Sequence, residues 1–159
     1  MTHHQALHNL ITQAADASGK VFKIKGRLLP MFDAFTATGE RLIFPVPSGD
    51  KDSSLAIVRA LFKLRNVTRC VYIDEAWMLD AATEADQAFA QSESLATHPR
   101  RIEVVMYAAE DETGHLHGYR RIIRPRHGKA RLGELQINDF GGTYEGRFIG
   151  MLPVRGTRQ

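Results

Sequence analysis

Cysteine is almost missing from this chain of 159 residues, and long apolar runs are missing altogether. The single Cys70 has no partner for an internal disulfide, and its apolar neighbours predict a buried, unreactive thiol. No run approaches the roughly 18 apolar residues that cross a bilayer. The first residues show neither the charged start nor the cleavage site of a secretory signal. We therefore expect a cytoplasmic protein with no redox chemistry and no membrane association.

Motifs that identify a reaction are missing as well. No serine lies in a Gly-x-Ser-x-Gly elbow, so nucleophilic catalysis by serine has no support. The loop at 47–54 precedes a helical pattern, as a phosphate-binding loop would, but it has one glycine where that loop needs two. Aspartates on both sides of Lys51 would also repel a phosphate. The sequence therefore indicates no nucleotide and no other cofactor.

Hydrophobic periodicity is the clearest signal that is present. Apolar residues at helical spacing predict an N-terminal helix at about 2–17, ended by Ser18 and Gly19, and a second helix after the capping side chains of 48–53. The Ala-rich segment 80–95 predicts a third helix over at least its first half. Strands are predicted at 20–25, 32–35, 41–46, 69–78, 102–110, 115–124, 131–137 and 143–152.

The order of these elements predicts the fold class. Helices come early and a run of probable antiparallel strands comes late, which is typical of an α+β domain. We therefore expect one domain over residues 1–159, with a mostly antiparallel sheet of about five to seven strands and two or three helices on one face. An outer strand of such a sheet has unpaired N–H and C=O groups, so the protein is a candidate for homo-oligomer formation through a sheet edge.

The best-defined element is a β-hairpin in the second half of the chain. Two extended runs, 102–110 and 115–124, flank the polar turn Asp111-Glu112-Thr113-Gly114. Glycine at the fourth place allows the positive φ that this turn needs. The hairpin is a structural prediction and does not identify a reaction.

Charge is distributed unevenly, although the formal net charge is only +3. Residues 70–99 hold six acids and no lysine or arginine, whereas residues 100–131 hold eight lysines or arginines and four acids. In one interpretation the two segments are neighbours in the fold and neutralise each other. In the other interpretation the cations form an outward surface that binds an acidic partner.

The second strand of the hairpin carries many of these cations. On an extended strand Arg120, Arg124 and Arg126 share one face, and Tyr119 and Arg121 share the other. The predicted partner-binding residues are Arg101, Tyr119, Arg120, Arg121, Arg124, Arg126 and Arg131. They favour a binding or adaptor domain that uses a basic sheet surface against an acidic macromolecular partner. Nucleic acid is the alternative partner, with a tyrosine of this sheet (Tyr107 or Tyr119) stacked on a base if it is exposed.

His115 and His117 suggest a different class of function, a metal-assisted hydrolase. Two histidines at alternate positions of a strand point to one face, and both imidazoles can bind the same zinc ion. The acids of 110–112 lie across the turn and are candidates for an oxygen ligand. A catalytic zinc needs three converging ligands, so solvent-facing histidines near a turn are the more ordinary interpretation. The main hypothesis is thus a binding domain and not an enzyme.

Overall fold

The computed structural model describes residues 3–80, 85, 88, 95–138, 142–144 and 151–152. Within these ranges the helices and strands are, in chain order, α1 (His3–Lys25), β1 (Met31–Thr36), β2 (Arg41–Pro45), α2 (Lys51–Leu64), β3 (Val67–Asp80), the 3-10 helix η1 (Leu95–Thr97), β4 (Ile102–Asp111), β5 (Gly114–Ile123), β6 (Arg131–Asn138) and β7 (Gly142–Tyr144). Six strands form one antiparallel sheet in the order β2-β1-β3-β4-β5-β6, and β7 pairs with the end of β3. The predicted α+β class and antiparallel sheet are confirmed.

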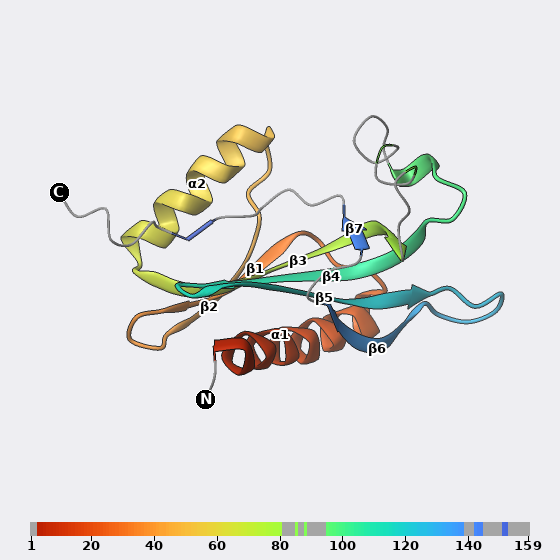
Figure 1. Ribbon diagram of the computed structural model, residues 1–159, viewed down its shortest axis with the longest axis horizontal. Helices are drawn as coiled ribbons and strands as arrows, with labels where there is room; N and C mark the ends of the chain where they lie inside the picture. Colours follow the sequence, from red (N-terminus) through yellow and green to blue (C-terminus); the bar gives the residue numbers. More distant parts are fainter. Residues whose placement is uncertain are drawn as a thin grey trace.

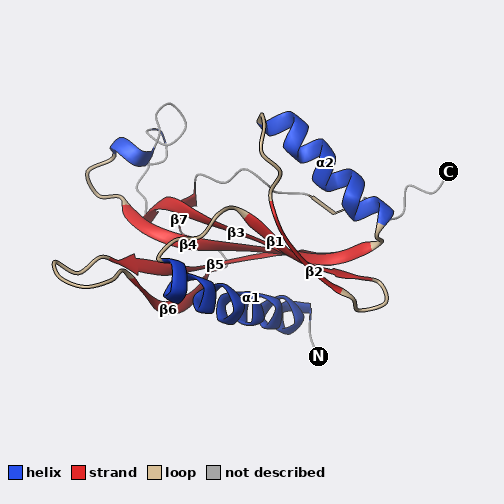
Figure 2. Ribbon diagram, turned by 180° about the vertical axis from the view of Figure 1, so that it is seen from behind, coloured by secondary structure: helices blue, strands red, loops and turns tan. Residues whose placement is uncertain are grey.

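The two helices lie on opposite faces of the sheet (Figures 1 and 2). One hydrophobic core lies between α1 and the sheet and includes Ile11, Phe22 and Tyr107. A second core lies on the α2 side and includes Phe32 and Phe62. The prediction that the helices share one face is therefore wrong, because each face of the sheet has apolar side chains that need a cover.

Strand β3 shows why the sheet needs two covers. Val71 and Ile73 belong to the α1-side core, and the alternate residues Cys70 and Tyr72 belong to the α2-side core. Successive side chains of a strand point to opposite faces, so this continuous apolar run buries both of its faces. Burial also raises the pKa of the Cys70 thiol, and the nearby carboxylates of Glu110 and Asp33 add to the shift. The predicted unreactive thiol fits this environment.

Helix α1 is longer than the sequence pattern predicts. It continues through Ser18 and Gly19 and ends at Gly26, whose φ of 72° is in the left-handed region and whose N–H donates to the Phe22 carbonyl at 2.7 Å. The predicted helix end near residue 17 and the predicted strand at 20–25 are wrong. The extra turns bury Phe22 on the helix face that also carries Ile11 and Ala15. In the part of the chain that the structure describes, no helix combines the length and the apolar character needed to cross a bilayer.

Helix α2 begins as its sequence predicts. Asp50 is the N-cap, and its side chain accepts a hydrogen bond from the Ser53 backbone N–H at 2.9 Å. The hydroxyl of Ser54 donates to the Pro47 carbonyl at 2.8 Å. The polar residues before this helix thus serve as a cap.

The predicted hairpins are confirmed within one or two residues at each end. Strands β1 and β2 pair from Met31 with Pro45 to Phe35 with Arg41, and strands β4 and β5 pair from Val104 with Arg121 to Asp111 with Gly114. Strand β6 also agrees with its prediction. Most of the predicted helix at 80–95 lies outside the described residues, although Asp80 belongs to β3 and Leu95 begins η1. Most of the predicted strand at 143–152 also lies outside them, apart from the residues in β7.

Candidate anion-binding site

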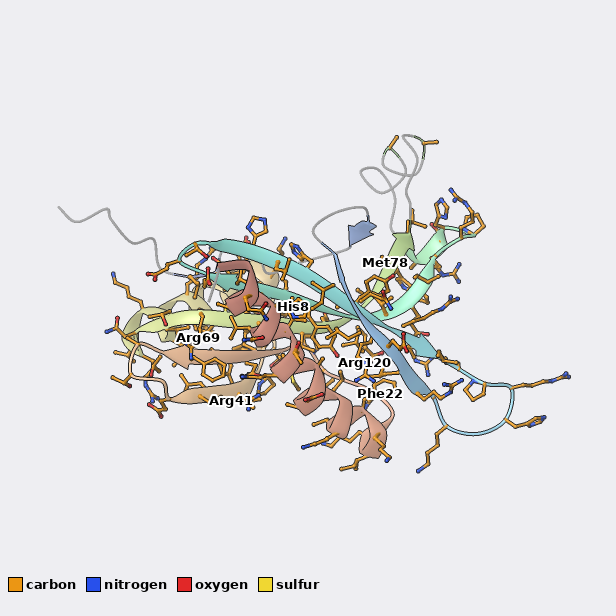
Figure 3. The ribbon with its side chains drawn as sticks, turned by 60° about the horizontal axis from the view of Figure 1, so that its bottom comes forward. His8, Phe22, Arg41, Arg69, Met78 and Arg120 are labelled. Carbon is orange, nitrogen blue, oxygen red and sulfur yellow. The ribbon has the colours of Figure 1, made fainter. Side chains whose placement is uncertain are left out.

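A cavity of about 380 Å³ lies between the C-terminal half of α1 and the start of β6. We call it the α1–β6 cavity. Its wall contains one glycine, three apolar residues and four cations, namely Gly19, Phe22, Lys23, Arg120, Lys129, Ala130, Arg131 and Leu132. Figure 3 shows Phe22 and Arg120 beside each other where α1 crosses the sheet. The volume is near the lower end of the roughly 300–1,000 Å³ of small-molecule sites, so the cavity suits one compact chemical group.

Arg120 is held in this wall by main-chain oxygens from two elements. Its Nε donates to the Gly133 carbonyl of β6 at 2.8 Å, and its Nη1 donates to the Ala15 carbonyl of α1 at 3.5 Å. The side chain is partly buried. A guanidinium that is fixed in this way loses little further side-chain entropy when it binds an anion. The fold therefore holds the positive charge of Arg120 at the wall of the cavity.

The buried side chain of Tyr107 interacts with the Arg120 guanidinium. The hydroxyl groups of Tyr107 and Ser18 are 3.0 Å apart, and both residues are buried between α1 and the sheet. Burial raises the pKa of the Tyr107 phenol, and hydrogen bonds with Ser18 and Arg120 and the charge of Arg120 partly offset that shift. Tyr107 is therefore a structural partner of Arg120, and its ring is not available to stack on a ligand.

Gly19 makes room for the guanidinium beneath the helix. A Cβ atom at this position would lie 2.8 Å from Nη1 of Arg120, which is closer than non-bonded atoms normally approach. Glycine inside a helix is less favourable than alanine by roughly 0.5–1 kcal/mol. The helix therefore gives up some intrinsic stability at a residue that lies against the end of Arg120.

The cations of the cavity have no carboxylate partner among the described residues. Three ion pairs among the described residues join Arg41 to Asp33, Arg65 to Glu40 and Arg124 to Glu103, and none of them includes a residue of the cavity wall. Two exposed acids, Asp16 and Glu134, lie on α1 and β6 but do not line the cavity. The residues that line the cavity thus carry a net positive charge, which would attract a bound anion.

The structure brings only two of the predicted partner-binding residues, Arg120 and Arg131, into this cavity. Arg124 follows the end of β5, and its Nε donates to the Glu103 carboxylate of β4 at 2.8 Å, with a second bond from Nη2. These contacts raise the pKa of Arg124, chiefly through its hydrogen bonds with Glu103. Arg101 lies over the Trp77 ring at 4.9 Å and donates to a main-chain oxygen. Both arginines are therefore engaged within the protein.

The remaining predicted residues lie elsewhere. Tyr119 packs against the α2-side core, and Arg121 pairs with Val104 of that same core, so both face away from the cavity. Arg126 is exposed in the connection between β5 and β6. Because β5 ends at Ile123, the expected strand face shared by Arg120, Arg124 and Arg126 does not form.

Sequence analysis missed the residues that α1 and the β5–β6 connection contribute. The sequence pattern predicts a helix end and a strand at Gly19, Phe22 and Lys23, and it gives no functional signal at Ala130 or Leu132. Lys129 counts only as one of the eight cations of residues 100–131. A helical reading of 3–25 would have placed Gly19, Phe22 and Lys23 on adjacent turns. The approach of α1 to β6 had no signal in the sequence, because it depends on how the helix crosses the sheet.

The histidine pair lies on the face of the sheet that α2 covers in part. The rings of His115 and His117 are 5.7 Å apart, centroid to centroid. The nearest predicted oxygen ligand, Glu110, accepts hydrogen bonds from the Met151 and Leu152 N–H groups at 3.0 and 3.4 Å. Among the described residues, no three histidine, cysteine or acidic side chains are arranged to hold a metal ion. The geometry therefore gives the hydrolase hypothesis no third ligand within those residues.

We expect the buried imidazole of His117 to make the stability of the folded protein fall in acid. Burial lowers its pKa, and the neighbouring His115 lowers it further. As the pH falls below the ordinary histidine pKa of about 6.5, His117 therefore binds a proton in the unfolded chain before it does so in the folded protein. The stability present above that value is lost as the pH falls toward the lowered pKa of the folded state. We expect His117→Gln to unfold with a weaker dependence on pH between 7.5 and 5, measured by urea denaturation at several pH values.

The matched control is His127→Gln, at an exposed position of the β5–β6 connection. It should keep the pH dependence of the unmodified protein. An unchanged slope in the His117 variant would show that burial of this imidazole does not affect folding.

Comparisons with protein-family models, with curated proteins and with solved structures gave no match. The protein is therefore classified by geometry alone, as an α+β domain with a cavity lined by cations at the crossing of α1 and β6.

Proposed function

We propose that the protein is a binding module that holds an acidic segment of a partner protein at the α1–β6 cavity. The observation that carries this proposal is the composition of the cavity wall, with four cations and no carboxylate. An acidic segment would supply the missing negative charge. The proposal keeps the acidic partner that the sequence favours, but it moves the contact from the hairpin strand to the junction of α1 and β6.

Further cations extend the proposed basic patch beyond the cavity. Lys20 and Lys25 are exposed on the last turns of α1, and Arg27 is exposed just after it. Two exposed apolar residues, Ile24 and Leu29, lie among them at 80% and 60% exposure. An interface that combines cations with isolated apolar contacts suits a protein segment with alternating acidic and apolar residues.

Nucleic acid is a weaker candidate for the same surface. Sequence-independent binding of a single strand combines cations with exposed aromatic rings on which bases stack. Tyr107 is buried, and Tyr119 lies in the α2-side core, so neither tyrosine stands beside the cavity. Phe22 lines the cavity but is itself buried.

Fluorescence anisotropy with a labelled peptide of alternating Glu and Leu tests the proposal. We expect binding at low ionic strength that weakens at least tenfold with added salt, because exposed charges are screened within about 10 Å at 0.1 M. A peptide with Gln in place of Glu should not bind. The double variant Lys23→Gln, Arg131→Gln should bind the acidic peptide at least tenfold more weakly.

The matched control removes two cations from α2 on the opposite face, as Lys51→Gln with Lys63→Gln. It should keep the affinity of the unmodified protein. Equal binding of the Glu and Gln peptides would overturn the proposal. Tighter binding of a single-stranded oligonucleotide than of the acidic peptide would replace the protein partner with nucleic acid. Self-association through the outer strands β2 or β6 stays a prediction, which light scattering of the free protein would check.

A further inference from the structure

We infer that the α1–β6 cavity is a specific subsite for an oxyanion joined directly to an apolar group. The oxyanion would bind Arg120, and the apolar group would pack against Ala130 and Leu132, which are only partly buried. This inference rests on the proposed function, because the subsite would hold the residue of the acidic partner that makes the central contact. A carboxylate beside an apolar side chain, as at a chain end that finishes in leucine, has this chemistry.

The wall of the cavity divides into a polar and an apolar part. The cations come from separate parts of the fold. Lys23 belongs to α1 and Arg120 to β5, Lys129 lies in the connection between β5 and β6, and Arg131 is the first residue of β6. Ala130 and Leu132 provide the accessible apolar part, and the third apolar residue of the wall, Phe22, is itself buried. A bare inorganic anion would leave these apolar groups uncovered, and an uncharged apolar group would leave the cations unpaired. A ligand that carries both groups contacts both parts.

The position of Arg120 accounts for specificity in addition to attraction. Lys23, Lys129 and Arg131 are exposed, so their side chains can change conformation to contact different ligands. Hydrogen bonds to the Gly133 and Ala15 carbonyls hold the Arg120 guanidinium in one position. A fixed donor favours an anion at one place in the cavity. The partly buried Ala130 and Leu132 in the same wall then offer the surface for the apolar group.

Small probes test this subsite separately from the wider basic patch. The probes are N-acetyl-leucine, its uncharged amide N-acetyl-leucinamide, acetate and phenyl phosphate, titrated into the ¹⁵N-labelled protein. We expect N-acetyl-leucine and phenyl phosphate to shift the signals of the Arg120 Nε–H and the Gly19 amide. The amide and acetate should bind at least tenfold more weakly. Equal binding of acetate and N-acetyl-leucine would overturn the inference, because it would show charge attraction alone.

Gly19→Ala is the sharpest variant, since its added Cβ would displace the end of Arg120 without removing a charge. We expect at least a tenfold loss of N-acetyl-leucine affinity with an unchanged or higher stability, because alanine favours the helix. The control Ala17→Gly changes a partly buried α1 residue that does not line the cavity, and it should keep the affinity. Arg120→Lys, which keeps the charge but loses the planar donor, should also lose affinity at least tenfold.

The two proposals fail in different ways. If the peptide of alternating Glu and Leu binds but none of the small probes does, the subsite is refuted and the proposed function stands. If the peptide does not bind and N-acetyl-leucine does, the site serves a free organic anion and the partner-protein function is refuted. Selective binding of phenyl phosphate over N-acetyl-leucine would assign the oxyanion as a phosphate and keep the subsite.

Discussion

Replacing Phe32 with alanine is expected to lower the free energy of unfolding by about 3–5 kcal/mol. Phe32 is fully buried in β1, and its ring lies 5.2 Å from the rings of Phe62 and Tyr72 and 5.8 Å from that of Phe44. The side chain thus joins α2 and three strands of the sheet. Its removal leaves a cavity that these aromatic neighbours cannot all fill, because each is fixed by its own element.

Urea denaturation followed by circular dichroism measures this loss. The control is Ile57→Ala, because Ile57 lies on α2 but is 51% exposed. Surface changes of this kind usually alter stability by less than about 0.5 kcal/mol. A loss for Phe32→Ala as small as that of the control would mean that the α2-side core is not held together by this ring.

Replacing Arg41 with methionine is expected to cost about 3 kcal/mol, more than the replacement of its partner Asp33 with asparagine. The Arg41 Nε and Nη2 atoms bind the two carboxylate oxygens of Asp33 at 2.9 and 2.7 Å. The Asp33 side chain is 2% exposed, whereas that of Arg41 is 38% exposed. These hydrogen bonds raise the pKa of Arg41.

The expected asymmetry follows from what each variant leaves behind. Without Arg41, the buried Asp33 carboxylate has lost its charge partner and cannot reach water. Without the Asp33 charge, Arg41 remains in contact with water and lies over the Phe35 ring at 5.6 Å. Denaturation of both single variants and of the double variant gives the coupling energy. Equal losses in the two single variants would show that the burial of Asp33 does not dominate this pair.

Local patterns predicted the separate elements well. The alternating runs around the turn at 111–114 predicted β4 and β5, and the capping residues before α2 predicted its start. The sequence also showed Cys70 to Ile73 as an apolar run without alternation, which is typical of a strand covered on both faces. Helices on both sides of the sheet follow from that observation, although the predicted architecture placed them on one.

Tertiary contacts decided the features that could not be predicted. Ser18 and Gly19 are residues that commonly end helices, yet α1 continues because the sheet offers a place for Phe22. The candidate site depends on the same contact, since it forms where the added turns of α1 meet β6. Arg120 of the basic strand lies in the candidate site, and its role there stays a prediction. Hydrogen bonds with main-chain oxygens and with Glu103, and not the strand pattern, determine where the arginine side chains lie.

The main-chain oxygen of Ala15 and the guanidinium of Arg120 meet across 105 positions of the chain. The first helix is made early in synthesis, but the walls opposite it exist only after β5 and β6 have joined the sheet. A ligand of this cavity would therefore recognise the completed fold and ignore partly folded chains. At one hundred times its dissociation constant it would add about 2.7 kcal/mol to the stability of the native state, and occupancy would report that folding has finished.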